Sequence, residues 1–204
     1  MTLKTENLGK RYNREWVFRN FNYSFEPGVY AITGPNGSGK STLLQVLWGQ
    51  LPASEGTILY DIENKNVLIE DVYQNLAIAT PYLELIEEFT LEETIKFHFS
   101  FKKIRDNKST SELIDLLELT HVRKKAVRQF SSGMKQRLKL GLAFFSDVSL
   151  IFLDEPTTNL DKEAVAWYWR NLTLLAAKSI LFIGSNLENE YPPQATRINL
   201  LDYK

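Results

Sequence analysis

The stretch GPNGSGKS at Gly34–Ser41 decides the fold. It follows the apolar, β-branched run Val29–Thr33 and precedes Lys40–Trp48, where leucines recur at helical spacing. A strand, a glycine-rich loop and a helix in this order predict a phosphate-binding loop. Glycines let the backbone wrap an anion, and the helix begins with its positive end toward it. With these flanks, a chance glycine-rich turn is a poor alternative.

Each kind of group in this loop has an expected role. Successive backbone N–H groups meet the β-phosphate of a nucleotide, Lys40 reaches the β- and γ-phosphate oxygens, and the Ser41 hydroxyl binds Mg²⁺. The residues that we expect to contact the nucleotide in this segment are Gly34, Pro35, Asn36, Gly37, Ser38, Gly39, Lys40, Ser41 and Thr42.

A second chemical element is LIFLDE at Leu150–Glu155, an apolar run that ends in two acids. After a phosphate-binding loop, Asp154 fits the acid that holds Mg²⁺ through water, and Glu155 fits the general base for an attacking water. Pro156 stops the strand directly afterwards. Two acids without such a loop would indicate only an ordinary strand end, so the interpretation depends on both segments.

The pattern along the chain alternates between strands and helices. Strands are expected at Glu15–Phe25, Val29–Thr33, Ser149–Leu153, Ser179–Gly184 and Thr196–Leu201, with shorter ones near Ile58, Leu68 and Ile78. Helices are expected at Lys40–Trp48 and Lys162–Ala176, and a helical insertion at Leu91–Phe145 includes a helix capped by Ser109 or Ser111. This alternation predicts an α/β fold with a mostly parallel sheet covered on both faces.

Composition limits the classes of partner. The chain has 204 residues, 44% of them hydrophobic, which suits one compact unit. The 24 lysines and arginines nearly balance the 25 acids, so no nucleic acid partner is expected. There is no cysteine, which excludes disulfides and thiolate chemistry and suits a reducing compartment. Apolar runs fall short of the roughly 18 residues that cross a bilayer, so a membrane role requires a partner.

The segment FSSGMKQR at Phe130–Arg137 points to one family. It resembles the LSGGQ signature of ATP-binding cassette (ABC) proteins. The resemblance implies that Ser131, Ser132, Gly133 and a helix N-terminus grip the γ-phosphate of ATP bound by another subunit. A serine hydroxyl, a glycine amide and a helix end together suit an anion. Taken alone, Ser-Ser-Gly before a helix would be only an N-cap.

The resemblance covers essentially the whole chain and implies further roles. Tyr12 stands where the family places an aromatic side chain on adenine, and Thr158–Asp161 looks like the D-loop that follows the catalytic acid, with Asp161 near the nucleotide. Two alternatives stay open, because Tyr12 suits a core strand and Asp161 suits a helix N-cap. The implied fold is a single domain at 1–204, a P-loop NTPase core with an N-terminal antiparallel β subdomain and a helical subdomain at about 83–145.

Two positions depart from the family pattern. Pro81 or Tyr82 stands where the family has a glutamine that touches Mg²⁺ and the membrane partner, so a metal contact there needs water or a nearby acid such as Glu84. Asn186 stands where the family has a histidine that contacts the γ-phosphate. An asparagine donates a hydrogen bond but carries no charge. We therefore expect slow ATP hydrolysis by the isolated protein, with Glu155 and Asn186 as its catalytic residues.

The function that the resemblance implies is an ATPase subunit of an ABC transporter, with ATP and Mg²⁺ as cofactors. It would act as an ATP-dependent homodimer or paired cassette with a separate transmembrane permease, in the cytoplasm at the inner face of the cell membrane. Small ABC-2 or haem-exporter cassettes look most similar. The alternative is a soluble ABC-type ATPase that remodels a ribosome or nucleic-acid complex. The signature segment disfavours a small-molecule kinase or a GTPase.

Overall fold

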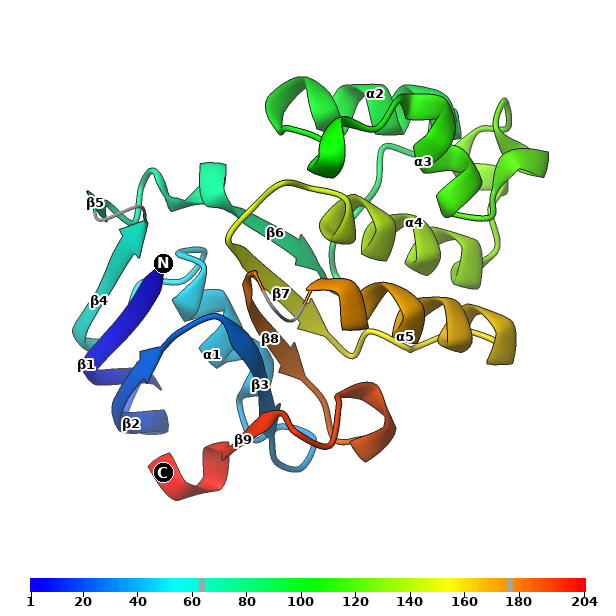
Figure 1. The fold of residues 1–204 in the computed structure, drawn as a ribbon. Helices are drawn as coiled ribbons and strands as arrows, with labels where there is room; N and C mark the ends of the chain where they lie inside the picture. Colours follow the sequence, from blue (N-terminus) through cyan, green and yellow to red (C-terminus); the bar gives the residue numbers. More distant parts are fainter. Residues whose placement is uncertain (63–64, 176–177) are drawn as a thin grey trace.

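Two sheets and a set of helices make up the computed structural model, which describes residues 1–62, 65–175 and 178–204 (Figure 1). The strands are β1 (Thr2–Tyr12), β2 (Glu15–Phe25), β3 (Gly28–Thr33), β4 (Glu55–Ile62), β5 (Lys65–Val67), β6 (Leu76–Ala79), β7 (Leu150–Asp154), β8 (Ile180–Gly184) and β9 (Thr196–Asn199). The α-helices are α1 (Lys40–Leu47), α2 (Leu91–Phe101), α3 (Thr110–Leu116), α4 (Ser132–Phe144) and α5 (Lys162–Leu175).

The central sheet is parallel and has five strands in the order β6-β7-β8-β3-β9. Every residue of β7 and β8 is buried, which is typical of parallel strands covered on both faces. Alternate residues of β7 serve opposite faces: Ile151 packs with the cluster that includes α2–α5, and Phe152 packs with the cluster that includes α1. The predicted α/β fold with a covered parallel sheet is confirmed.

The second sheet is antiparallel, with four strands in the order β2-β1-β4-β5. Its buried face joins α1 and the central sheet in one apolar cluster. Phe25 of β2, for example, meets Phe182 of β8 edge to face with ring centroids 4.8 Å apart. The expected antiparallel β part is therefore present, and α1 is packed between the two sheets (Figure 1).

The structure adds one strand to the prediction and shortens another. Residues 2–12 form β1, although their sequence pattern is polar. The strand was missed because bulges interrupt its alternation, as between Thr5 and Leu8, where Asn7 has a positive φ of 47°. The predicted strand Thr196–Leu201 ends at Asn199, since the Asn199 side chain accepts a hydrogen bond from the Leu201 N–H (3.2 Å) and starts a 3-10 turn. The predicted helix end at Ala176 lies outside the described residues.

Helices α2, α3 and α4 occupy Leu91–Phe144; α4 lies beside α5 on one face of the sheet, and α2 and α3 lie beyond α4 in the same apolar cluster (Figure 1). Capping boxes begin two of them: Thr90 with Glu93 before α2, and Ser109 with Glu112 before α3. Of the two caps considered from the sequence for α3, Ser109 is the one used. These reciprocal bonds satisfy N–H groups that a helix start leaves without partners.

A partly buried histidine gives this helical region a pH dependence. His98 Nε2 lies 3.0 Å from Ser146 Oγ, and burial, with a smaller effect of Lys102, lowers the pKa of His98 from 6.5 to about 4. Between these two pH values the unfolded chain binds more protons than the folded protein. Folding stability is therefore lost as the pH falls through this window.

We expect His98→Gln, whose amide can still bond Ser146, to lose less stability than the wild type between pH 6.5 and about 4. Urea unfolding across this pH range measures the difference. His121→Gln, at an exposed histidine, is the matched control and should follow the wild type. Parallel pH profiles for wild type and His98→Gln would contradict the assignment.

Candidate functional site

The site lies at the edge of the central sheet where β3, β7 and β8 end. Parallel pairing sets Ile32 of β3 and Asp154 of β7 on either side of Gly184 of β8. The segments that follow these strands therefore emerge side by side, which is where open parallel sheets place their ligands. The glycine-rich loop, the two acids and Asn186 follow β3, β7 and β8 respectively.

The loop after β3 leads directly into α1. Gly39 is the residue before this helix and has a φ of 105°, a backbone angle that residues with a side chain rarely adopt. A Cβ at Gly39 would also lie 2.2 Å from Val17 Cγ1 of β2, so β2 packs against the loop. At Gly37, with φ 76°, an added Cβ would meet nothing within 4 Å, so only the backbone requires glycine there. Strand β2 and α1 together hold the shape of the loop.

Lys40 folds back beneath the loop that precedes it. Its Nζ donates hydrogen bonds to the carbonyl oxygens of Gly34 (2.9 Å) and Pro35 (3.3 Å). Burial lowers the pKa of Lys40, while the nearby charges of Asp154 and Glu155 oppose that change. A buried ammonium held by two neutral carbonyls gains from an added anion.

Asp154 is 2% exposed, and its Oδ1 has no hydrogen-bond partner among the described residues. The pKa of its carboxyl is raised, mainly by burial. The hydrogen bond from Ser41 and the charge of Lys40 lower this pKa, and the charge of Glu155 raises it. Space for the carboxylate depends on Gly184, because a Cβ there would lie 2.7 Å from Asp154 Oδ1. Strand β8 thus leaves room for this acid at the site.

Glu155 is exposed and stands in the left-handed region, with φ 45°. Its N–H donates to the carbonyl oxygen of Gly184 (2.9 Å), which ties this backbone to the end of β8. Strained positions of this kind persist only where neighbours hold them, and they cluster at functional sites. The strained turn directs the chain away from the sheet immediately after the buried acid.

These oxygens fit Mg²⁺ only together with a nucleotide. Asp154 Oδ1 has no hydrogen-bond partner among the residues that the structure describes, and the Ser41 hydroxyl hydrogen-bonds the same carboxyl group. Within the described ranges, no group of three or more His, Cys, Asp or Glu side chains could hold a metal ion. Mg²⁺ commonly binds one or two protein oxygens, several waters and substrate phosphates. The donor set suits Mg²⁺ carried by a triphosphate.

The signature segment Ser131–Gly133 opens α4 and packs against the loop after Glu155. Ser131 is the N-cap, with its Oγ accepting from the Met134 N–H at 3.2 Å. A Cβ at Gly133 would lie 2.8 Å from the carbonyl oxygen of Asn159. The buried Gln136 amide donates to the Pro156 carbonyl oxygen (2.9 Å). The exposed residues Ser131 and Ser132 therefore lie at a helix end that is fixed to the loop after Glu155.

The two weaker sequence candidates differ in their surroundings. Tyr12 is 50% exposed at the end of β1, with Lys10 Nζ 5.2 Å from its ring centroid, so it is not a core aromatic. Asp161 Oδ1 accepts from the Ala164 N–H (2.8 Å), which is the N-cap contact considered as its alternative. The structure therefore leaves the Tyr12 ring open to a ligand and gives Asp161 a helix-capping contact.

Of the two positions considered for the missing glutamine, Tyr82 lines the cavity that also contains Asp154. That cavity, about 310 Å³, includes Thr80, Tyr82, Glu84 and Asp154 in its walls. Pro81 instead lines a neighbouring cavity of about 450 Å³ with Lys139. Lys139 Nζ donates to the carbonyl oxygens of Thr80 (3.3 Å) and Pro81 (3.0 Å). This segment is thereby bonded to the signature helix α4.

Asn186 lies next to the phosphate-binding loop. Its Nδ2 donates to Oδ1 of Asn36, and both residues line a cavity of about 590 Å³. Tyr191 and Arg197 line the same cavity, and Lys204 Nζ donates to the carbonyl oxygen of Ser38 (2.9 Å). Sequence reasoning missed these last three residues, since no motif marks them and β9 brings the C-terminal part beside β3.

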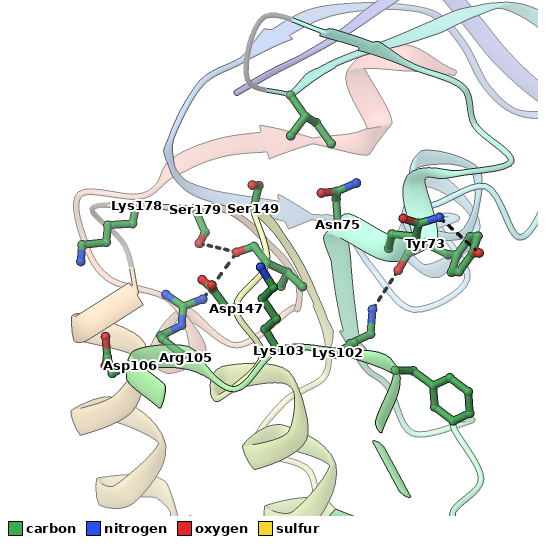
Figure 2. Close-up of a pocket in the computed structure, with 14 residues that line it drawn as sticks. Tyr73, Asn75, Lys102, Lys103, Arg105, Asp106, Asp147, Ser149, Lys178 and Ser179 are labelled. Carbon is green, nitrogen blue, oxygen red and sulfur yellow. Dashed lines mark hydrogen bonds between the residues drawn. The ribbon is translucent and has the colours of Figure 1, made fainter. Parts of the chain in front are cut away.

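A larger cavity lies elsewhere. About 800 Å³ in volume, it is lined by Asn75, Ser149 and Ser179, which precede β6, β7 and β8, and by cations such as Lys103 and Arg105 (Figure 2). It therefore opens at the amino ends of these strands. The phosphate-binding loop follows the carboxyl end of β3, so this cavity lies at the opposite edge of the sheet from the candidate site.

A family model described as "ABC transporter" matches residues 18–158. The chain belongs to the ABC transporter family. The lantibiotic transport ATP-binding protein SrtF of Streptococcus pyogenes is 33% identical to this cassette over 165 residues, 78% of the chain and 68% of that relative. This cassette spans about two thirds of the length of the curated relatives it matches. The sequence-based assignment to the ABC family of ATPases is confirmed.

Solved structures support the same fold. An ABC transporter ATP-binding protein from Pyrococcus furiosus matches all of this cassette and 99% of that chain, with a TM-score of 0.83 and 24% identity. The dimeric structure of a bacterial ABC transporter cassette matches 92% of this chain and 90% of the other, with a TM-score of 0.76 and 22% identity. The predicted P-loop architecture is therefore confirmed.

We expect Asp154→Asn to raise the free energy of unfolding of the nucleotide-free protein at neutral pH, by about 1 kcal/mol. Burial raises the pKa of Asp154, so the ionised carboxylate opposes folding once the pH exceeds its usual value. The gain should shrink as the pH falls toward 3.8, the usual pKa of this group. Urea unfolding without nucleotide measures it, with Glu155→Gln at the exposed neighbour as the control. A destabilised Asp154→Asn protein would contradict this account.

Proposed function

We propose that this cassette hydrolyses Mg·ATP between two copies of itself, or with a paired cassette, to power movement of a solute by a separate permease. One observation carries the proposal. Lys40 and the partnerless Oδ1 of Asp154 meet beside the exposed Glu155 at one edge of the parallel sheet. A cation, an unfilled oxygen ligand and a free base suit a metal-bound triphosphate and an attacking water.

Each residue in this arrangement has a distinct task. The loop Gly34–Gly39 wraps the phosphates, with Lys40 turning from the loop carbonyls to the β- and γ-phosphates. Ser41 and Asp154 hold Mg²⁺, which offsets charge on the phosphates when it is bound. Glu155 accepts a proton from water. Asn186, already beside Asn36, donates a hydrogen bond to the γ-phosphate, and the exposed Tyr12 ring stacks on adenine.

A dimer completes the site in this proposal. Ser131, Ser132 and Gly133 are at the N-terminus of α4, where a helix favours an anion. The cavity beside Asn36 and Asn186 contains none of these three residues in its walls, which suits their binding the ATP of another subunit. Asp161 would lie near the same interface. The similarity to a dimeric cassette fold supports this arrangement.

Transport is favoured over remodelling of ribosomes or nucleic acid. SrtF is named for lantibiotic transport, and other relatives are named for Nod factor export. The net charge of −1 also gives nucleic acid no general attraction. We therefore place the cassette on the cytoplasmic face of the cell membrane, held there by its permease, as in ABC-2 type exporters.

Nothing in residues 1–62, 65–175 and 178–204 forms a helix long and apolar enough to span a membrane. Exposed apolar side chains gather in the segment after β6, at Tyr82, Leu83 and Ile86. We assign this segment to contact with the permease, because Tyr82 lines the same cavity as Asp154 and Lys139 of α4 bonds the Pro81 carbonyl oxygen. It would transmit nucleotide binding to the permease.

We expect Glu155→Gln to form a stable dimer with Mg·ATP, because the change removes the base but keeps the shape of the site. Light scattering measures the dimer. The double variant with Ser131→Arg should stay monomeric yet bind ATP as tightly as the single variant, since Ser131 serves the other subunit. A monomer at saturating Mg·ATP in the single variant would sink the dimer model.

We expect Asn186→Ala to lower kcat, by roughly 10²-fold if its donor faces the γ-phosphate, with little change in ATP affinity. Asn186→His should raise kcat, because the new side chain can carry a positive charge against the developing charge. Steady-state ATPase assays compare the three proteins. Equal rates would mean that residue 186 does not reach the phosphate.

A further inference from the structure

A buried carboxylate joins the loops that follow β7 and β8. Glu190, at the end of the 3-10 turn Glu188–Glu190, is only 1% exposed. Its Oε1 accepts hydrogen bonds from the N–H (2.9 Å) and the hydroxyl of Thr157, and its Oε2 accepts from the hydroxyl of Ser185. One side chain therefore bridges two segments that leave neighbouring strands.

The two ends of this bridge adjoin proposed catalytic residues. Thr157 is two residues beyond Glu155, in a turn closed by the Thr158 N–H on the Glu155 carbonyl oxygen (3.2 Å). Ser185 directly precedes Asn186, and the Ser185 N–H donates to the Ile32 carbonyl oxygen of β3 (3.1 Å). The bridge thus lies between the base and the side chain that meets Asn36 of the phosphate-binding loop.

Glu190 is a buried acidic side chain whose hydrogen-bond partners are neutral. In the described ranges, no lysine, arginine or histidine forms an ion pair with it. Burying a carboxylate without a cation is costly, and the three donors of Thr157 and Ser185 offset that cost. A carboxylate provides what this bridge requires, two oxygens that accept from both loops at once.

The main chain of Glu190 is fixed as well. Its carbonyl oxygen accepts a hydrogen bond from the Tyr168 hydroxyl of α5 (2.6 Å), and Tyr168 is fully buried. The main chain that carries the carboxylate is therefore bonded to a helix that packs on the sheet. A side chain with a fixed main chain and hydrogen bonds to both loops can set the distance between them.

We propose that Glu190 is a positioning residue for ATP hydrolysis, which holds the Glu155 loop and the Asn186 loop at the separation that turnover requires. The inference rests on the proposed function, because it assumes that both loops serve hydrolysis. Glu190 does not touch the nucleotide. Its loss shifts the base relative to the γ-phosphate, and displacements near 1 Å at a reacting centre can reduce rates by roughly 10²-fold.

The test compares kcat, KM and the amount of ATP bound per chain in Glu190→Ala and Glu190→Gln. We expect Glu190→Ala to lower kcat by roughly 10- to 100-fold while bound ATP stays near the wild-type amount. Glu190→Gln should stay within about threefold of the wild-type kcat, because its amide oxygen accepts from Thr157 and its NH₂ donates to Ser185 Oγ. Rescue by glutamine distinguishes bridging from the need for a charge.

Two controls separate positioning from general stability. Asn189→Ala changes an exposed residue in the same turn and should leave kcat unchanged. Tyr168→Phe removes the bond to the Glu190 main chain but keeps the carboxylate bridge, so it should lower the Tm while lowering kcat less than Glu190→Ala does. If Glu190→Ala does not fold, Ser185→Ala removes the bond from Ser185 to Glu190 and should lower kcat at least roughly tenfold.

Several results would overturn the inference. One is a wild-type kcat in Glu190→Ala, or in Ser185→Ala if Glu190→Ala does not fold. Another is a kcat that falls only in proportion to the amount of bound ATP. The third is a Glu190→Gln variant as slow as Glu190→Ala. If the wild type itself does not hydrolyse ATP, both the proposed function and the role of Glu190 fail. Wild-type turnover with an unaffected Glu190→Ala removes only the role of Glu190.

Discussion

The parallel register of β3, β8 and β7 is the constraint on which the site depends. It sets Ile32 and Asp154 on either side of Gly184, so the segments after the three strands start from one edge. Each strand is short and buried on both faces, which makes a shift of register costly because every side chain would change faces. The absence of a Cβ at Gly184 then leaves the space that Asp154 Oδ1 occupies.

Around this edge the protein buries charged groups, which an ordinary structural core does not contain. Burial lowers the pKa of Lys40 and raises that of Asp154. The charged form of each group is therefore less stable in the protein than it would be in water. Glu155 adds a strained backbone. Under the proposed function, a nucleotide with Mg²⁺ would supply the opposite charges to both Lys40 and Asp154. Binding energy and folding energy are thus linked at the same residues.

Long-range contacts join the signature helix α4 to the core at two points. Gln136 bonds the Pro156 carbonyl oxygen, one residue beyond Glu155, and Lys139 bonds the carbonyl oxygens of Thr80 and Pro81. These hydrogen bonds connect α4 both to the loop after Glu155 and to the segment after β6, where Lys139 bonds main-chain oxygens.

Local patterns in the sequence were sufficient for the strand-loop-helix at Val29–Trp48, for the acidic end of β7 and for the capped helix at Ser109, since each depends on neighbouring residues alone. They were insufficient for β1, where bulges interrupt the alternation along the strand that pairs with β2 and β4. The bridge from Glu190 to Thr157 and Ser185 joins segments on either side of α5 and β8, and no spacing in the sequence encodes it. The sequence by itself determined which chemical groups this protein carries, while the tertiary structure decided which of them meet. Parallel strands bring together residues more than a hundred positions apart, as Asn36 and Asn186 are, and only the packed sheet sets that distance.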